Sequence, residues 1–308
     1  MNGRTYDLVH RTTYEYAQPV TDSYGRTTLT PRDLPDQRVL ATSLTIDPEP
    51  ADGGRHVDWF GNTTTYFGVT RPHTRLVVTA RSTLEVSRVA PARADLPDTG
   101  WRAVARGVTA ADLGVLRTDA AGVVALREAV LPSAHVTFVD EVREWAAPSF
   151  VDERPLADVV TDLLHRIRTE LTYRSGSTTV HTTQAQLLAQ GAGVCQDFAH
   201  LMIAALRVHG VPARYASGYI ETRPLPGRAK LRGADASHAW VSVWLPGHGW
   251  LDADPTNDQL VDDRYVVLGW GRDYHDVPPL RGVIFTEGGG ATPRVEVDLV
   301  PAGSEPFV

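Results

Sequence analysis

The chain has little sulfur and almost no amine chemistry of its own. Among 308 residues there is one cysteine, Cys195, and one lysine, Lys230, whereas the other basic residues are arginines. A single cysteine cannot form a disulfide within the chain, so nothing in the sequence demands an oxidising compartment. A single lysine leaves the protein with almost no side-chain amine of its own.

Long hydrophobic runs are also missing. No stretch approaches the roughly 20 apolar residues that a membrane-spanning helix needs. Residues 1–7 lead into an alternating strand pattern rather than the apolar run of a signal peptide. We therefore expect a soluble cytoplasmic protein without a membrane partner.

The charge balance excludes a further class of partner. The net charge of −7 gives no electrostatic reason to expect binding to nucleic acid. A hydrophobic content of 42% and a charged content of 22% are ordinary for a globular protein. A chain of 308 residues is long for one core, so two domains are expected. Nothing in the sequence indicates the oligomeric state.

Residue periodicity divides the chain near residues 91–100, a stretch rich in proline and small residues. Before it, apolar and polar residues alternate over 6–16, 40–46 and 76–86, which predicts strands. After it, the pattern becomes helical. We therefore predict a β-rich domain over residues 1–95 and a mixed helix and strand domain over 96–308.

The second part predicts two apolar helices and a sheet. One helix follows Pro155, and the other begins at Cys195 and stops before Gly210 and Pro212. The expected fold is therefore α+β, with the helix that bears the cysteine packed on an antiparallel sheet. The strands expected to complete that sheet are residues 214–220, 238–245, 250–253, 265–268 and 295–299.

Cys195 stands where a loop should turn into a helix. The unpaired N–H groups of a helix N-terminus favour a thiolate over a thiol. Downstream, His238 opens one apolar strand and Asp254 ends another. A thiol, an imidazole and a carboxylate are the parts of a nucleophile, a base and an orienting group. The alternative for a cysteine alone is a small buried hydrophobic residue.

The orienting carboxylate is ambiguous at this stage. The strands that hold His238 and Asp254 are joined by a short turn over residues 246–249, so the two side chains can lie side by side. Asp252 lies two residues earlier on the same strand face and competes for this role. Tyr173 could lend its hydroxyl to an oxyanion, although a packed tyrosine is the commoner outcome.

Other kinds of site have weaker support. The eleven histidines include no pair with the HExxH spacing, and His200 lies off the helix face of Cys195. No metal site is therefore expected. The Gly191–Ala192–Gly193 segment is too short for a dinucleotide or phosphate loop, so no cofactor is expected either.

Four ordered segments resemble the bacterial transglutaminase-like superfamily, and together they are specific. The first ~90 residues also resemble the β-rich domain that precedes this core in bacterial members, with matches at Pro31-Arg32, Gln37 and Phe60-Gly61-Asn62. The four segments cover residues 193–201, 210–219, 238–241 and 249–257 within a core of about 155–260.

The resemblance implies a papain-like α/β catalytic core after the N-terminal β domain. It assigns Cys195 as the nucleophile, His238 as the base and Asp254 as the orienting group, in preference to Asp252. It implies no calcium site. Bacterial relatives are commonly described as cysteine proteases.

Three functions are consistent with these sequence features. The expected one is a thiol acyl-transfer enzyme that forms a thioester on Cys195 from a peptide or isopeptide amide and hydrolyses it. The first alternative is an amide-forming acyltransferase of the transglutaminase type. The second is a non-catalytic binding or scaffold protein. The substrate, the second oxyanion donor and the fate of the thioester are not specified by the sequence.

A long segment before His238 is expected to border the site. Residues 221–236 contain prolines and glycines but few large apolar residues, which predicts a mobile loop that helps to select the substrate. The alternative is a solvent-exposed connection without a role in substrate selection. The basic residues of this loop suggest an acidic group on the substrate; they are Arg223, Arg228, Lys230 and Arg232.

Overall fold

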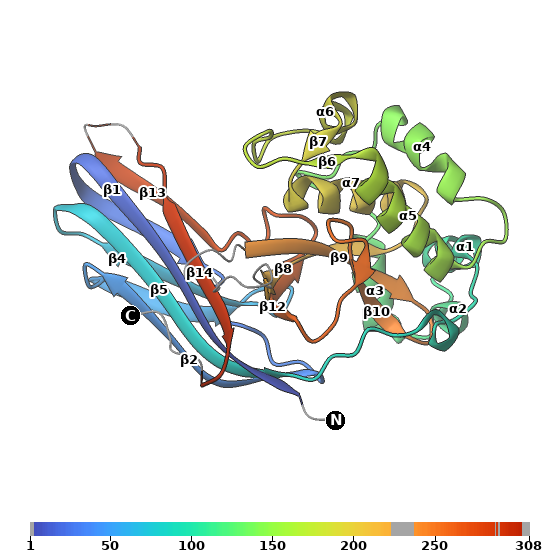
Figure 1. Cartoon of the computed structure of the whole chain (residues 1–308), viewed down its shortest axis with the longest axis horizontal. Coiled ribbons are helices and arrows are strands. Elements are labelled where there is room, and N and C mark those ends of the chain that lie inside the picture. The colour runs from blue at the N-terminus through green and yellow to red at the C-terminus, as the bar shows by residue number, and fades with distance from the viewer. Residues whose placement is uncertain (1–2, 223–236, 287, 289, 304–308) are drawn as a thin grey trace, which may run out of the picture.

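The structure is a computed structural model that describes residues 3–222, 237–286, 288 and 290–303. It is a mixed helix and sheet fold, as predicted, with an N-terminal sheet on one side and a helical layer on the other (Figure 1). A smaller sheet, here called the core sheet, lies between them.

The N-terminal sheet is organised around one long strand, β1 (Arg4–Thr27). Its first half pairs with β5 on one side and β14 on the other, and its second half pairs with β4 and β13. An irregularity between Glu15 and Val20 separates the two halves. The other strands of this sheet are β2 (Gln37–Asp47), β3 (Asp52–Val57), β4 (Thr63–Val69), β5 (His73–Val86), β13 (Leu280–Thr286) and β14 (Arg294–Pro301).

One strand assignment from the sequence is wrong. Residues 295–299 were expected to complete the core sheet, but β14 pairs antiparallel with β1 in the N-terminal sheet. Val297 and Leu299 are buried there beside Tyr6 and Leu8. Alternation identifies a strand and its apolar face but not its partner, so this strand fits either sheet by pattern alone.

The core sheet has the order β11-β10-β9-β8-β12 in the part of the chain that the structure describes. Its neighbouring strands are all antiparallel. The strands are β8 (Ala213–Ile220), β9 (Ser237–Leu245), β10 (Gly249–Asp254), β11 (Gln259–Leu260) and β12 (Tyr265–Gly271), and a separate two-stranded piece joins β6 (Thr172–Tyr173) to β7 (Ala192–Gly193).

Helix α7 (Cys195–Val208) packs on β9 and β8 and forms the centre of the helical layer. Residues 197–207 of α7 are all buried, as expected for a helix that is apolar around most of its circumference. Gly210 has φ +78° and ends the helix, as its position in the sequence predicted. The other helices are α1 (Trp101–Ala110), α2 (Leu113–Leu116), α3 (Ala120–Glu128), α4 (Asp140–Ala146), α5 (Leu156–Glu170) and α6 (Gln184–Gln190), with short 3₁₀ turns η1 (Arg93–Asp95) and η2 (Ala147–Ser149).

Both faces of the core sheet are covered. Residues of one face, such as Val241 and Val243, belong to the hydrophobic core under the helices. Tyr219, Val266 and Leu268 belong to the core of the N-terminal sheet instead. The two sheets are therefore joined by shared apolar packing. Within the described residues, no helix is both long and apolar enough to cross a membrane.

Close packing between β8 and β12 yields a stability prediction. A Cβ added at Gly218 would lie 1.9 Å from the Val266 carbonyl oxygen and 2.6 Å from the ring of Trp240. Gly218→Ala should therefore force the two strands apart and lower the free energy of unfolding by about 3 kcal/mol. Gly114→Ala is the control, because its Cβ would have no neighbour closer than 3.4 Å. Denaturant titration of both variants checks this, and equal stabilities would contradict it.

Candidate active site

Cys195 is the first residue of α7, and the preceding loop is held by a carboxylate. Asp197 is buried, and its Oδ2 accepts hydrogen bonds from the Val194 N–H at 2.8 Å and the Thr178 hydroxyl at 2.6 Å. Burial raises the pKa of Asp197 against the effect of these two donors. The first N–H groups of the helix remain unpaired within it, and Cys195 stands among them, half-buried.

His238 lies near the start of β9 and is buried. Its Nε2 is 2.7 Å from Oδ2 of Asp254, which ends β10. Cys195 lies near enough to His238 to contribute to the raised pKa of the imidazole. The structure therefore brings together all three residues that the sequence predicted.

The electrostatics favour a charged imidazole. Burial alone would lower the pKa of His238, but the charge and hydrogen bond of Asp254, with a smaller effect of Cys195, raise it to about 10. Burial would likewise raise the pKa of Asp254, yet His238 and the other donors around that carboxylate hold it below its usual value. The stable state of this buried pair is therefore an ionised Asp254 in contact with a protonated His238.

Asp254 is completely buried, and protein donors satisfy both of its oxygens. Oδ1 accepts the Thr256 N–H at 2.9 Å. Oδ2 accepts the Asn257 side-chain amide at 2.6 Å and the Tyr265 hydroxyl at 2.7 Å, in addition to His238. These contacts orient the carboxylate, and Tyr265 is the partner that the sequence gave no reason to single out.

The two candidate carboxylates on β10 have different partners. Asp252 accepts a hydrogen bond from the Ser242 hydroxyl on the neighbouring strand. Asp254, not Asp252, is hydrogen-bonded to His238. The pairing of β9 and β10 therefore places Asp254, and not Asp252, beside the imidazole.

Two tyrosines lie close to Cys195. Burial, and then the neighbouring Cys195, raise the pKa of Tyr173 and of Tyr215 above the usual range, which keeps both phenols protonated as hydrogen-bond donors. Tyr215 is buried, whereas Tyr173 is 52% exposed. Tyr173 is thus not the fully packed residue that was considered the commoner outcome.

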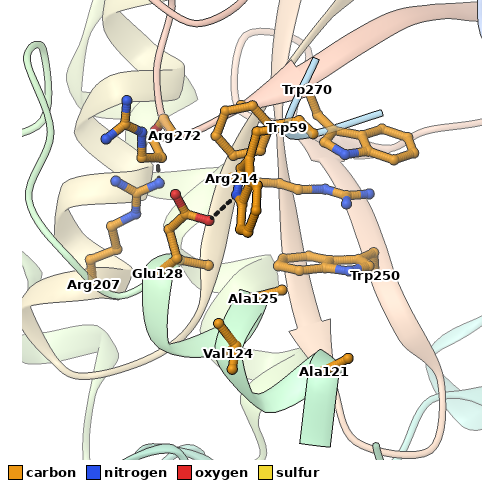
Figure 2. A pocket seen from close by; sticks show the side chains of 13 residues that line it. Trp59, Ala121, Val124, Ala125, Glu128, Arg207, Arg214, Trp250, Trp270 and Arg272 are labelled. Atoms are coloured by element: carbon orange, nitrogen blue, oxygen red, sulfur yellow. Dashed lines mark hydrogen bonds between the residues drawn. The ribbon is translucent and has the colours of Figure 1, made fainter. Parts of the chain in front are cut away.

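Three further features of the molecule remain: possible metal ligands, the loop before His238 and a separate cavity. Within the described ranges, no group of three or more His, Cys, Asp and Glu side chains is arranged to hold a metal ion. The loop expected to border the site, residues 221–236, lies outside the described residues except for Glu221 and Thr222. A cavity of about 440 Å³ lies elsewhere, lined by Trp59, Trp250 and Trp270 (Figure 2).

The hydrogen bond to Asp254 predicts how His238 titrates. Asp254→Asn should lower the pKa of His238 from about 10 by several units, toward the ordinary value of about 6.5, because the opposing charge is lost while burial remains. A raised pKa adds stability that is full below about pH 6.5 and lost as the pH rises through about 10. The variant should lack this loss. Histidine NMR and unfolding at several pH values measure both effects, and Asp252→Asn should behave as native.

Comparisons with known proteins agree with this architecture. Residues 6–85 match the family model of the bacterial transglutaminase-like N-terminal region, and residues 143–255 match that of the transglutaminase-like superfamily. An uncharacterized protein of Mycobacterium tuberculosis is 48% identical over 310 residues, which cover 96% of this chain and 92% of that protein. A protein-glutamine gamma-glutamyltransferase of Pseudomonas aeruginosa is 42% identical over 67 residues, 21% of this chain and 10% of that enzyme.

A solved structure shares the fold along the whole chain. It is described as a "Putative Cysteine Protease" from Cytophaga hutchinsonii, with a TM-score of 0.74 and 20% sequence identity over 100% of this chain and 94% of that one. The chain belongs to the transglutaminase-like superfamily and carries the bacterial transglutaminase-like N-terminal region in front of its core.

Proposed function

We propose that the protein is a thiol acyl-transfer enzyme that acts on a peptide or another amide, with Cys195, His238 and Asp254 as its catalytic triad. The observation that carries this proposal is the 2.7 Å contact of His238 Nε2 with a fully buried carboxylate. Cys195, at the N-terminus of α7, lies near enough to the same ring to help raise its pKa. A scaffold protein has no need to keep a charged imidazole between a buried carboxylate and a thiol.

The first half of the reaction follows from this arrangement. The thiolate of Cys195 attacks the amide carbonyl carbon, a C–S bond forms, and the carbonyl electron pair moves to oxygen. N–H groups at the start of α7 stabilise that oxyanion, together with a phenol of Tyr173 or Tyr215. His238 then gives its proton to the amide nitrogen as the C–N bond breaks, so an amine leaves and a thioester remains.

The second half decides the class of enzyme. Water or an amine attacks the thioester, His238 accepts a proton from it, and the thiolate leaves. We propose hydrolysis as the main outcome, in line with the fold that the chain shares with the Cytophaga hutchinsonii structure. Transfer to an amine is the alternative, favoured by the segment similar to the Pseudomonas aeruginosa glutamyltransferase. The lone cysteine agrees with a reducing compartment, and the cytoplasm remains our proposed location.

Thiol reactivity tests the proposed nucleophile. Iodoacetamide should alkylate Cys195 at a rate that hardly changes between pH 6 and 8, because His238, whose pKa is raised to about 10, remains a cation beside the sulfur throughout this range. An ordinary thiol, with a pKa of about 8.5, would instead react about ten times faster per pH unit in this range. His238→Ala should restore that ordinary slope. A native profile with the ordinary slope would rule the proposal out.

The fate of the thioester is measured with a glutamine-containing peptide in the presence and absence of a small primary amine. Mass spectrometry should detect an acyl adduct on Cys195, and the product should be the free acid even when the amine is present. Incorporation of the amine would instead establish the transferase alternative. Cys195→Ser should give neither product while its melting temperature stays close to native, because the two side chains differ little in size.

A further inference from the structure

Among the described residues, strand β12 is the outer strand of the core sheet, and β8 is its only strand partner. The backbone groups on its other side are buried by the N-terminal sheet, so they need hydrogen-bond partners. Two side-chain amides of the N-terminal sheet region, Gln37 and Asn62, supply such partners. The backbone N–H of Arg32 adds another, because it donates to the Val267 carbonyl at 3.3 Å.

Gln37 bonds to both backbone groups of one residue in β12. Its Oε1 accepts the Val267 N–H at 2.8 Å, and its Nε2 donates to the Val267 carbonyl at 2.9 Å. The same Nε2 also donates to the Arg32 carbonyl at 2.8 Å. Gln37 is 1% exposed, so water does not compete for these bonds.

Asn62 repeats this arrangement farther along the strand. Its Oδ1 accepts the Trp270 N–H at 3.0 Å, and its Nδ2 donates to the Trp270 carbonyl at 2.9 Å. Arg32 and Asp58 hold the same amide from the other side, at 2.7 Å and 2.9 Å. Asn62 is completely buried.

The spacing of the two contacts depends on a bulge. In a regular strand, residues two apart direct their backbone groups to the same side, whereas Val267 and Trp270 are three apart. The pairing of β12 with β8 is shifted between Val267 and Gly269, which adds the extra residue. Gly269 leaves the space for Asn62, because a Cβ there would lie 2.6 Å from its Oδ1. The strand is therefore shaped to fit these two amides.

The strand held in this way carries Tyr265. The Tyr265 hydroxyl donates to Asp254 Oδ2 at 2.7 Å, the same oxygen that meets His238. Its ring also lies against the His238 ring, with the centroids 6.1 Å apart, and against Trp240, at 5.5 Å. A shift of β12 along β8 would therefore move a donor and a packing surface of the triad.

Aromatic contacts reinforce the same junction. Trp59 from the N-terminal region donates its indole N–H to Glu128 of α3 at 2.9 Å (Figure 2). Trp270 of β12 lies between two guanidinium groups, those of Arg32 at 3.6 Å and Arg214 at 3.7 Å. These contacts join the parts around the strand. Gln37 and Asn62 each bond to both backbone groups of one residue of β12, which is the kind of contact that fixes a strand's register.

We propose that Gln37 and Asn62 are positioning residues of the active site, which hold β12 in the register that brings the Tyr265 hydroxyl to Asp254. The catalytic importance of these residues rests on the proposed function. Their effect on the Asp254 carboxylate can be measured whether or not the protein is an enzyme. The N-terminal region is in this view a part of the catalytic machinery, not a separate binding module.

The expected effect has a definite sign. Without these amides, the Tyr265 hydroxyl should lose its contact with Asp254. A carboxylate that loses a donor binds a proton more readily, so the pKa of Asp254 should rise. Gln37→Met keeps the length of the side chain but removes its hydrogen bonds. Gly269→Ala should displace Asn62 and act in the same direction.

The experiment follows the protonation of Asp254 by carboxyl ¹³C NMR on the full-length chain. Tyr265→Phe sets the scale, because it removes the donor directly. Gln37→Met and Gly269→Ala should shift the Asp254 midpoint upward by at least half as much as Tyr265→Phe does. Val78→Ala is the matched control, because Val78 is fully buried in the N-terminal sheet and does not touch β12 through a hydrogen bond. It should lower the melting temperature without moving the midpoint.

The outcomes separate this inference from the proposed function. An unchanged midpoint in folded Gln37→Met and Gly269→Ala, or in Tyr265→Phe itself, would overturn the positioning role. So would fast hydrogen exchange of the Val267 and Trp270 amides in the native protein, a measurement that needs no variant. An ordinary thiol in the alkylation experiment would instead overturn the catalytic function and leave the Asp254 measurement intact.

Discussion

The burial of the Asp254 carboxylate is the constraint on which the rest of the site depends. An ionised carboxylate without contact with water is stable only with a cation and a full set of donors around it. His238 supplies the charge, and Tyr265 and Asn257 supply donors to the same oxygen. The imidazole is thereby charged and fixed in orientation before any substrate binds, which is the preorganisation that acyl transfer requires.

Satisfying this carboxylate involves much of the molecule. His238 comes from β9, Asp254 from β10 and Tyr265 from β12, so three strands must keep their register for one oxygen to be satisfied. The first two strands form a hairpin and have each other as partners. The third is an edge strand, which is the part of a sheet most able to slip or to pair wrongly. Its dependence on the N-terminal region is therefore a physical consequence of where Tyr265 lies.

The sequence predicted the features of the site that depend on neighbouring residues, such as a helix start or a short turn. The apolar residues of α7 and the glycine after it placed Cys195 at a helix start, and the short turn at residues 246–249 brought His238 and Asp254 within reach. The choice between Asp252 and Asp254 needed the resemblance, because both face the same way on β10. The contact of Tyr265 with Asp254 could not be predicted from the sequence. A tyrosine in an apolar strand is normally a core residue, and the partner of its hydroxyl is determined only by the tertiary pairing of the strands. Gln37 and Asn62 entered only as points of resemblance, without any indication that they contact β12.

The misassigned strand β14 shows how far the two parts of the chain depend on each other. It lies more than 260 residues after its partner β1. The entropic cost of closing a loop grows only slowly with loop length, so this long separation adds little to the free energy of forming the pair. Without β13 and β14, one side of β1 would be left unpaired along most of its length. A boundary near residues 91–100 therefore separates two patterns in the sequence, while the N-terminal sheet is completed by the end of the chain. The same sheet supplies Gln37 to the strand that carries Tyr265. Under our proposal, the pairing of β1 with β13 and β14 therefore also supports the geometry of the site.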